Sequence, residues 1–187
     1  MTVDQRKVAG LLIFLAAAQF SVGLMIAAAL HPGYSISDNF ISDLGVGPAA
    51  PVFNGSVILL GLLILAATYF IRNTFQSLAT AILLALIGIG AVGLGVFTED
   101  FGLVHTVFSG VAFIFAGVSA IYVARFLRWP LLHLSVILGA LVLVALVLFQ
   151  TGNFLGLGQG GMERMIVLPV LAWGLALGGY LMAGEAT

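Results

Sequence analysis

Hydrophobic positions along the chain form six long runs that polar segments separate. Each run has close to the roughly 20 mostly apolar residues that a helix needs to cross about 30 Å of hydrocarbon. The runs cover residues 8–30, 51–71, 76–97, 104–127, 130–150 and 163–183. Most connections between them are short, so consecutive helices are expected to be antiparallel neighbours. The pattern predicts an all-α membrane protein with a single domain, an antiparallel bundle of six transmembrane helices.

The composition agrees with a lipid environment and narrows the chemistry. Of the 187 residues, 62% are hydrophobic and 7% are charged, whereas about a quarter of the residues in soluble domains are charged. The net charge of -1 and the lack of a basic run give no reason to expect nucleic acid as a partner. The chain contains no cysteine, which excludes disulfides and thiolate metal sites. Membrane lipids are the expected partners.

The basic residues predict which way the bundle faces. Lysine and arginine in short loops are enriched on the cytoplasmic side of a membrane. If the N-terminus is inside, only Arg164 of the six basic residues lies outside. We therefore predict a multi-pass protein of the cell (plasma) membrane whose N- and C-termini are both cytoplasmic. The basic residues on the inner side are then Arg6, Lys7, Arg72, Arg125 and Arg128.

Groups capable of acid, base or metal chemistry gather at the predicted outer face. The first outer loop, residues 31–50, alternates polar groups with apolar ones. This alternation predicts a structured segment that folds back over the mouth of the bundle. Seven of the ten Asp, Glu and His residues lie in the outer loops or the outermost helix turns, namely His31, Asp38, Asp43, Glu99, Asp100, His105 and Glu163.

The start of the fourth helix carries one group of these candidates. Glu99 and Asp100 precede the helix, His105 lies in its first turn, and Ser109 follows one turn deeper on the same face. A histidine in this setting suits a metal ligand, a general base or an oriented hydrogen-bond partner. The simpler interpretation is that Glu99 and Asp100 only stabilise the positive end of the helix.

Glycines dominate the segment that precedes the sixth helix and recur along it. Residues 151–161 contain a G-x-G-x-x-G pattern, but no strand precedes it, so a dinucleotide site is not supported. We expect a flexible covering loop there, followed by Glu163 and Arg164 at the start of the helix. Gly174 and Gly178 form a G-x-x-x-G pattern, which indicates close helix packing within the chain or a homodimer through that face.

Several of these residues together resemble a known family. The elements are Gly33-Tyr34, Ile41-Ser42-x-Leu44-Gly45, His105, Glu163-Arg164 and Trp173. In this order and between the same helices, they resemble an uncharacterised archaeal or bacterial family of six-helix integral membrane proteins, a domain of unknown function. The resemblance covers nearly the full chain. It implies the six-helix fold and topology, and it implies no activity.

The first functional hypothesis is an outer-leaflet polar site that binds or processes a lipid or other amphiphile, including by hydrolysis. The predicted catalytic residues are His105, Asp43, Glu163, Ser42 and Ser109. The predicted cofactor-binding residues are Arg164, Tyr34 and Trp173. A zinc ion that activates water would take His31 and His105 as ligands, with Glu99 or Asp43 as the third. Neither histidine belongs to an H-x-x-x-H or H-E-x-x-H motif, so the metal pattern is weak.

Two alternatives stay open at this point. The first is a non-enzymatic lipid-binding, sensing or scaffold protein, in which Asp43, His105, Glu163 and Arg164 form a hydrogen-bonded latch that holds the loops over the bundle. The second is a b-type haem protein with His31 and His105 as axial ligands, which requires both rings at one depth across a haem-sized gap.

Overall fold

Six long helices make up the bundle, as the hydrophobic pattern predicts. A computed structural model describes residues 4–183, and this part of the chain contains no strand. Short 3-10 helices occupy the connections at Ser42–Gly45 (η1), Gly47–Ala49 (η2), Glu99–Phe101 (η3) and Ala124–Phe126 (η4). All six long helices are apolar and long enough to cross a membrane. They are α1 (Gln5–Leu30), α2 (Ala50–Phe75), α3 (Leu78–Val96), α4 (Leu103–Val123), α5 (Leu131–Gln150) and α6 (Gly158–Ala183).

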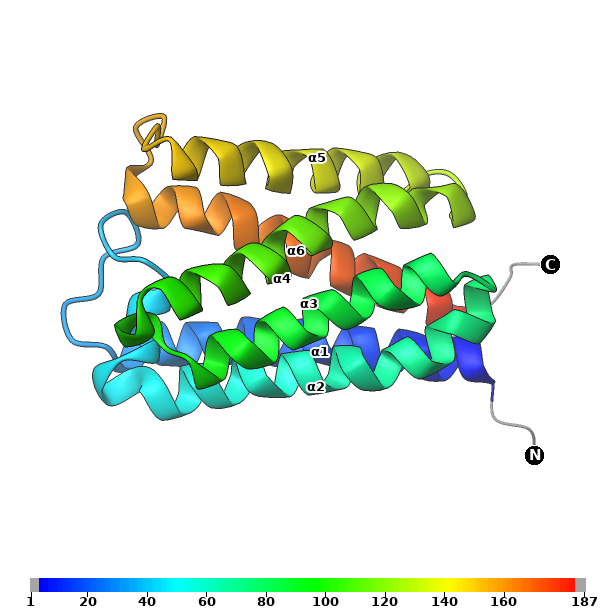
Figure 1. Cartoon of the computed structure of the whole chain (residues 1–187), viewed down its shortest axis with the longest axis horizontal. Helices are drawn as coiled ribbons and strands as arrows, with labels where there is room; N and C mark the ends of the chain where they lie inside the picture. Colours follow the sequence, from blue (N-terminus) through cyan, green and yellow to red (C-terminus); the bar gives the residue numbers. More distant parts are fainter. Residues whose placement is uncertain (1–3, 184–187) are drawn as a thin grey trace.

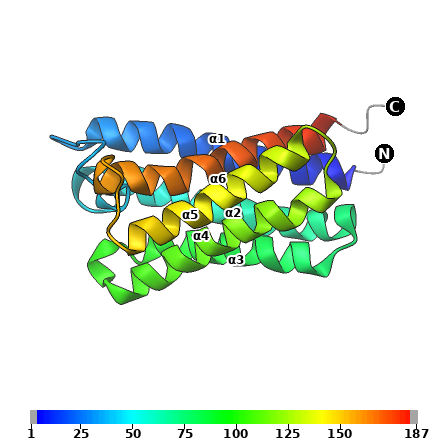
Figure 2. The ribbon, with the colours of Figure 1, turned by 90° about the horizontal axis from the view of Figure 1, so that it is seen from above.

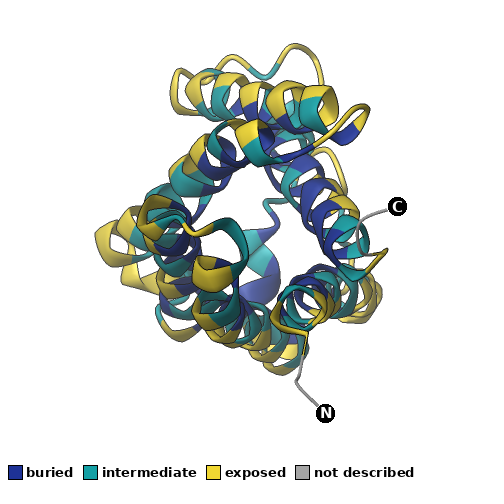
Figure 3. Cartoon of the chain, turned by 90° about the vertical axis from the view of Figure 1, so that its right-hand side faces the viewer, coloured by how far each residue is buried: buried dark blue, intermediate teal, exposed yellow. Residues whose placement is uncertain are grey.

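The helices form a closed ring. Each helix packs against the next one along the chain, and α6 packs against α1. Figure 3 shows this ring along its axis, with buried positions turned inward and exposed positions turned outward. Figures 1 and 2 show both chain ends at one end of the bundle, here called the terminus end. The connection between α1 and α2, residues 31–49, lies at the opposite end, here called the loop end.

Helix boundaries follow from local hydrogen bonding. The Asp4 side chain caps α1 by accepting the backbone N–H groups of Arg6 and Lys7 at 3.1 and 3.3 Å. Ser77 caps α3 in the same way by accepting the backbone N–H of Thr80 at 3.2 Å. Gln76 adopts a left-handed conformation, with φ of 48°, where α2 ends and the chain reverses. These caps fix the tight connection at the terminus end.

The glycine pair of α6 serves packing within the chain. A side chain on Gly178 would lie 2.7 Å from the backbone of Gly10 and Phe14, and one on Gly174 would lie 3.1 Å from Ala17. All of these contacts are with α1, which passes close to α6 because glycine has no side chain to hold it away. These two glycines therefore face α1 within the chain, and the homodimer through this helix face stays a prediction.

The connection between α1 and α2 closes the loop end of the ring. Ile41 and Leu44, three residues apart around η1, turn to the same side and are 2% and 0% exposed. Both side chains pack among residues of α1, α2 and α6. Burying each contributes about 1.5–3 kcal/mol relative to leaving it in water. The structured loop predicted from alternating polar and apolar residues is thus present, with its apolar members inserted into the bundle.

The sixth helix begins earlier than predicted. It starts at Gly158 rather than at residue 163, so the last residues of the predicted covering loop form its first turn. Gly158 and Gly160 lie directly beneath the first loop, and the backbone N–H of Gly160 donates to the Ser37 carbonyl at 2.9 Å. A side chain on Gly160 would collide with the Asn39 carbonyl. These glycines provide the surface on which the first loop rests.

Candidate functional site

A groove opens between α4 and α5 at the loop end of the bundle. The two helices touch where Gly117 faces Gly139, since a side chain on Gly139 would lie 2.7 Å from the Gly117 carbonyl. Figure 1 shows that they separate from there towards the loop end, with α6 behind the gap. The space between them holds about 740 Å³. We call it the lateral groove, and its volume lies in the range of about 300–1,000 Å³ typical of small-molecule sites.

The lateral groove is polar at one end and apolar along its length. Ser42, Glu99, His105, Ser109 and Glu163 line its polar end. Four of the five predicted catalytic residues therefore meet here, and two of the three predicted metal ligands, His105 and Glu99, are among the lining residues. His105 and Ser109 are four residues apart on α4, so they lie on one face of that helix. The apolar stretch is formed by Phe113, Ile114, Leu143, Leu146, Val147 and Ile166.

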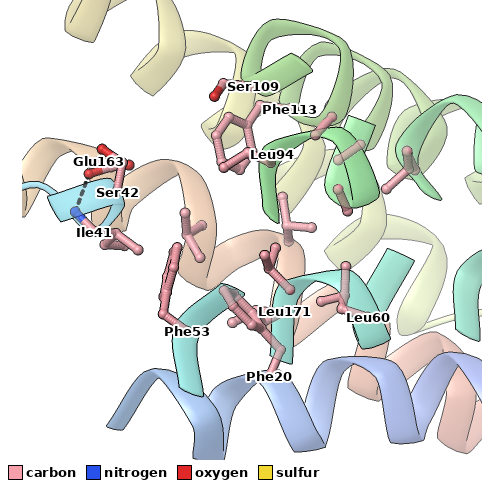
Figure 4. A pocket seen from close by; sticks show the side chains of 17 residues that line it. Phe20, Ile41, Ser42, Phe53, Leu60, Leu94, Ser109, Phe113, Glu163 and Leu171 are labelled. Atoms are coloured by element: carbon pink, nitrogen blue, oxygen red, sulfur yellow. Dashed lines mark hydrogen bonds between the residues drawn. The ribbon is translucent and has the colours of Figure 1, made fainter. Parts of the chain in front are cut away.

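A second, smaller cavity lies inside the ring, behind the lateral groove. It holds about 70 Å³, and apolar side chains make up most of its wall. Figure 4 shows Ile41, Ser42 and Glu163 at one edge of this inner cavity, with Phe20, Phe53 and other apolar side chains around it. The space suits a few water molecules and is too small for a lipid chain. The lateral groove is therefore the larger candidate site.

Glu163 stands between the two cavities. Its side chain is only 9% exposed, and it lines both spaces. One carboxylate oxygen accepts the backbone N–H of Ile41, which ties the first loop to α6. The second carboxylate oxygen has no hydrogen-bond partner among residues 4–183. A buried carboxylate is costly unless it is paired or hydrogen-bonded, so this second oxygen is the part of Glu163 available to a bound molecule.

Glu99 and Asp43 form a pair of neighbouring acids beside the lateral groove. Asp43 accepts hydrogen bonds from the Asn39 amide at 3.0 Å and from the Phe40 backbone N–H at 2.9 Å. Burial is the main cause that raises the pKa of Glu99 above its ordinary value of 4.5, and the adjacent Asp43 carboxylate raises it further. The Ser42 hydroxyl opposes this rise by hydrogen bonding to Glu99. The two acids therefore share a crowded negative site.

The raised pKa of Glu99 predicts a pH-dependent stability. The folded protein favours the protonated form of Glu99. The stability that Glu99 contributes is therefore fully present below its ordinary pKa of 4.5 and is lost as the pH rises through its raised pKa. We expect the Glu99→Gln variant to lose less thermal stability than the natural chain over that interval. Unfolding temperatures in a non-ionic detergent, measured from acidic to neutral pH, check this, with Asp4→Asn as the control. Parallel pH profiles for the natural chain and Glu99→Gln would contradict it.

The serines and the histidine of the lateral groove do not form a nucleophile–base pair in the described residues. The Ser109 hydroxyl donates to the His105 carbonyl of its own helix at 2.9 Å. The Nδ1 atom of His105 lies 2.8 Å from the Phe97 carbonyl, which can only accept, so Nδ1 carries the proton. Activation of a serine requires a hydrogen bond between its hydroxyl and a base. Ser109 and His105 therefore lie near each other without this arrangement.

The predicted metal ligands are divided between two spaces. His31 lines a hollow of about 400 Å³ with Asp43 and Asp100, His105 lines the lateral groove, and Glu99 borders both spaces. The His31 ring packs against Tyr34 with ring centres 5.5 Å apart. Within residues 4–183, no group of three or more His, Asp and Glu side chains is arranged to hold a metal ion. The zinc and haem hypotheses stay predictions without a ligand set.

Arg164 and Tyr34 hold the first loop in place. The Arg164 guanidinium donates to the carbonyls of Ile36 and Asn39 at 2.8 and 3.4 Å, and to the Tyr34 hydroxyl at 2.7 Å. The Tyr34 hydroxyl in turn donates to the Phe40 carbonyl at 3.0 Å. Burial raises the pKa of Tyr34, which keeps this donor protonated. Arg164 and Tyr34 were predicted to bind a cofactor, but in the structure their side chains hydrogen bond to the first loop.

Trp173 lies away from the other predicted site residues. It is ten positions after Glu163 on α6, which corresponds to about 15 Å along the helix. Its side chain is 4% exposed, and the indole N–H donates to the Ser135 hydroxyl of α5 at 3.1 Å. This hydrogen bond satisfies the only polar atom of the ring inside the bundle. The structure gives Trp173 a packing role between α5 and α6.

Several residues of the lateral groove were not predicted. Gly110, Thr106 and Phe113 continue the face of α4 that carries His105, and Leu143 and Leu146 face them from α5. The helical spacing from His105 through Ser109 could have pointed to the α4 residues. Nothing local marks the α5 residues, because apolar positions that line a groove have the same composition as those that face lipid.

The fold and the site together define a multi-pass membrane protein, a ring of six transmembrane helices with a side-opening groove that carries acids at one end. The family described as "Protein of unknown function (DUF998)" matches residues 14–180, and the chain belongs to this family. This confirms the resemblance to an uncharacterised membrane-protein family. No curated protein and no solved structure matches the chain.

Proposed function

We propose that this protein binds a single membrane amphiphile in the lateral groove. The head group would lie at the polar end, against Glu163, Glu99 and His105, and the alkyl chain would lie along the apolar stretch between α4 and α5. The observation that carries the proposal is the lateral groove itself, which has a volume of about 740 Å³. It has polar residues at the loop end and apolar residues along the rest of its wall between α4 and α5.

In a membrane, the head group rather than the alkyl chain must determine which amphiphile binds. Moving an alkyl chain from water into an apolar site contributes about 0.8 kcal/mol per CH₂ group. A chain that already lies in a bilayer gains little of this, because lipid tails are as apolar as the groove wall. The polar end of the groove must therefore distinguish the bound amphiphile from the surrounding lipid.

Binding is favoured over hydrolysis by the hydrogen bonds of the site. His105 is engaged with Phe97, and Ser109 is engaged with its own helix, so neither is poised for attack on a substrate. Of the four predicted latch residues, Glu163 and Arg164 bind the first loop from α6, and Asp43 accepts hydrogen bonds within that loop. The fourth, His105, contacts Phe97 instead. A lipid-binding or lipid-sensing protein is the function these contacts support, and hydrolysis stays a prediction.

We further propose that the lateral groove opens to the outer leaflet of the plasma membrane, with both termini in the cytoplasm. The positive-inside bias supports this, because Arg164 is the one basic residue that belongs to the loop end. The absence of native cysteine makes single-cysteine labelling clean. A cysteine at Ser37 should react with an impermeant maleimide on intact cells, and one at Arg128 should react only after permeabilisation. The reverse pattern would contradict the orientation.

Photo-crosslinking in nanodiscs tests the proposed binding. The probe is dodecanol with a diazirine on its chain, added at a low mole fraction of the nanodisc lipid. We expect labelled peptides to map to residues 110–114 of α4 and 143–147 of α5. The lipid-facing surface of α1, where Val22 and Met25 are 56% and 72% exposed, serves as the internal control. Equal labelling of α1 and of the groove helices would show ordinary boundary lipid and would overturn the proposal.

A further inference from the structure

Three of the four hydroxyl side chains that line the lateral groove donate hydrogen bonds to backbone carbonyls. Thr106 donates to the Gly102 carbonyl at 3.2 Å, and Ser109 donates to the His105 carbonyl at 2.9 Å. On the facing side, Thr151 lies within 3.1 Å of the Val147 carbonyl and donates back into its own helix. A hydroxyl that donates in this way still has free lone pairs. What these three side chains offer to a ligand is therefore acceptors.

The titratable groups of the lateral groove also present acceptors. Glu163 has a carboxylate oxygen without a hydrogen-bond partner among the described residues, and Glu99 adds a second carboxyl group to the polar end of the groove. The Nδ1 proton of His105 is directed to Phe97, which leaves Nε2 as an acceptor in the neutral ring. Gln150, exposed at the rim, is the lining residue whose side-chain amide could still donate.

No lysine or arginine forms an ion pair with the carboxylates of the lateral groove in the described part of the chain. The ion pair that the described residues do form, with nitrogen and oxygen within 4.0 Å, joins Lys7 to Asp4 at the terminus end, far from the groove. Among the described residues that line the groove, none is lysine or arginine. The nearest arginine in sequence, Arg164, directs its guanidinium to the first loop. Arg164 therefore acts on the Glu163 carboxylate only through its charge, without a close ion pair, and Glu163, at 9% exposure, is compensated less than a paired buried charge.

We infer that the amphiphile bound in the lateral groove carries a primary ammonium head group, which donates hydrogen bonds to Glu163 and Glu99. This inference rests on the proposed function and specifies its ligand class. A primary ammonium supplies three N–H donors and one positive charge in a compact group, which matches a site made of acceptors and carboxylates. An anionic head group would meet two acids and no free donor except at the rim.

Four dodecyl probes separate charge from hydrogen bonding. Dodecylamine has both, dodecyltrimethylammonium has the charge without N–H donors, dodecanol has one neutral donor, and dodecyl phosphate is an anion. Each competes with the diazirine probe in nanodiscs, at concentrations expressed as mole fractions of lipid. We expect dodecylamine to compete best, by at least about tenfold over the other three, because hydrogen bonds to charged groups contribute roughly 1.5–3 kcal/mol.

The Glu163→Gln variant tests whether the Glu163 carboxylate is the group that binds the ammonium head group. Glutamine keeps an oxygen that accepts the Ile41 backbone N–H, but it removes the charge. Competition by dodecylamine should weaken about tenfold or more in this variant, while competition by dodecanol stays the same. Asp4→Asn removes a carboxylate at the opposite end of the bundle and should change neither, since asparagine also caps a helix. If Glu163→Gln does not fold, as judged by its unfolding temperature, Glu99→Gln carries the same comparison.

The outcomes distinguish this inference from the proposed function. If no dodecyl compound competes, the lateral groove is not an amphiphile site and both fail. If dodecanol, dodecyltrimethylammonium or dodecyl phosphate competes as well as dodecylamine, the groove binds amphiphiles but the ammonium inference is overturned. If dodecylamine competes best and Glu163→Gln leaves that preference unchanged, the assignment to this acid is overturned.

Discussion

Replacing Gly110 with phenylalanine should remove amphiphile binding from the lateral groove while leaving the bundle folded. Gly110 lines the groove on α4, and an added side chain there meets open space, with nothing within 4 Å of its first carbon. A phenyl ring would therefore occupy the volume proposed for the ligand without pushing against backbone. We expect crosslinking at residues 143–147 to fall at least about tenfold, the ratio that corresponds to about 1.4 kcal/mol of lost binding energy.

The Gly55→Phe variant is the matched control for this prediction. Gly55 lies on α2, and a side chain added there also meets open space, but it lines none of the cavities described above. Both variants should keep the natural unfolding temperature in detergent, and only Gly110→Phe should lose crosslinking. Retention of crosslinking by a folded Gly110→Phe protein would contradict a ligand position between α4 and α5.

The Arg164→Ala variant should release the first loop from α6. Arg164 donates hydrogen bonds to Ile36, Asn39 and Tyr34, all within the loop. Hydrogen bonds to charged groups contribute roughly 1.5–3 kcal/mol each when buried. Because Arg164 is only partly buried, we expect loop opening to become easier by about 2–4 kcal/mol in total, a change of roughly 30- to 800-fold in the opening equilibrium.

Amide hydrogen exchange measures this change where the loop meets α6. The reporters are the backbone N–H groups of Ile41, which donates to Glu163, and Gly160, which donates to Ser37. Their protection should decrease in Arg164→Ala while that of the helix interiors stays the same, because local opening does not require global unfolding. The Arg72→Ala variant removes an exposed arginine at the terminus end and serves as the control. Unchanged protection of Ile41 and Gly160 in Arg164→Ala would contradict the latch.

Local composition was enough to predict the six helices and a structured first loop over the mouth of the bundle. A transmembrane helix needs an apolar run of fixed length, and six such runs are present in the chain. The first loop was expected to fold back over the bundle because apolar residues in a polar loop are costly to leave in water. Which of its residues insert was not predicted, and the structure shows that Ile41 and Leu44 do. The start of α6 could not be predicted in this way. Gly158 and Gly160 have the composition of a loop, and their helical role depends on contact with Ser37 and Asn39, more than a hundred residues earlier.

The site was predicted in part, for a related reason. Glu163, His105, Ser109 and Ser42 lie together because each occupies the loop end of its element, a property that helix orientation alone determines. The shape of the groove depends on where α4 and α5 cross, and that point is set by the approach of Gly117 to Gly139. A crossing point is a property of two packed surfaces, and neither helix specifies it alone. Arg164 and Trp173 were grouped with the site by sequence, but their side chains turn to other partners.

A crystal structure of the protein grown from lipid in the presence of dodecylamine tests the central claim most directly. The account predicts an alkyl chain between α4 and α5 beside Phe113 and Leu146, with its nitrogen within hydrogen-bond distance of Glu163. A lateral groove that is closed by its own side chains, or a dodecylamine molecule bound elsewhere while the groove holds none, would contradict the account.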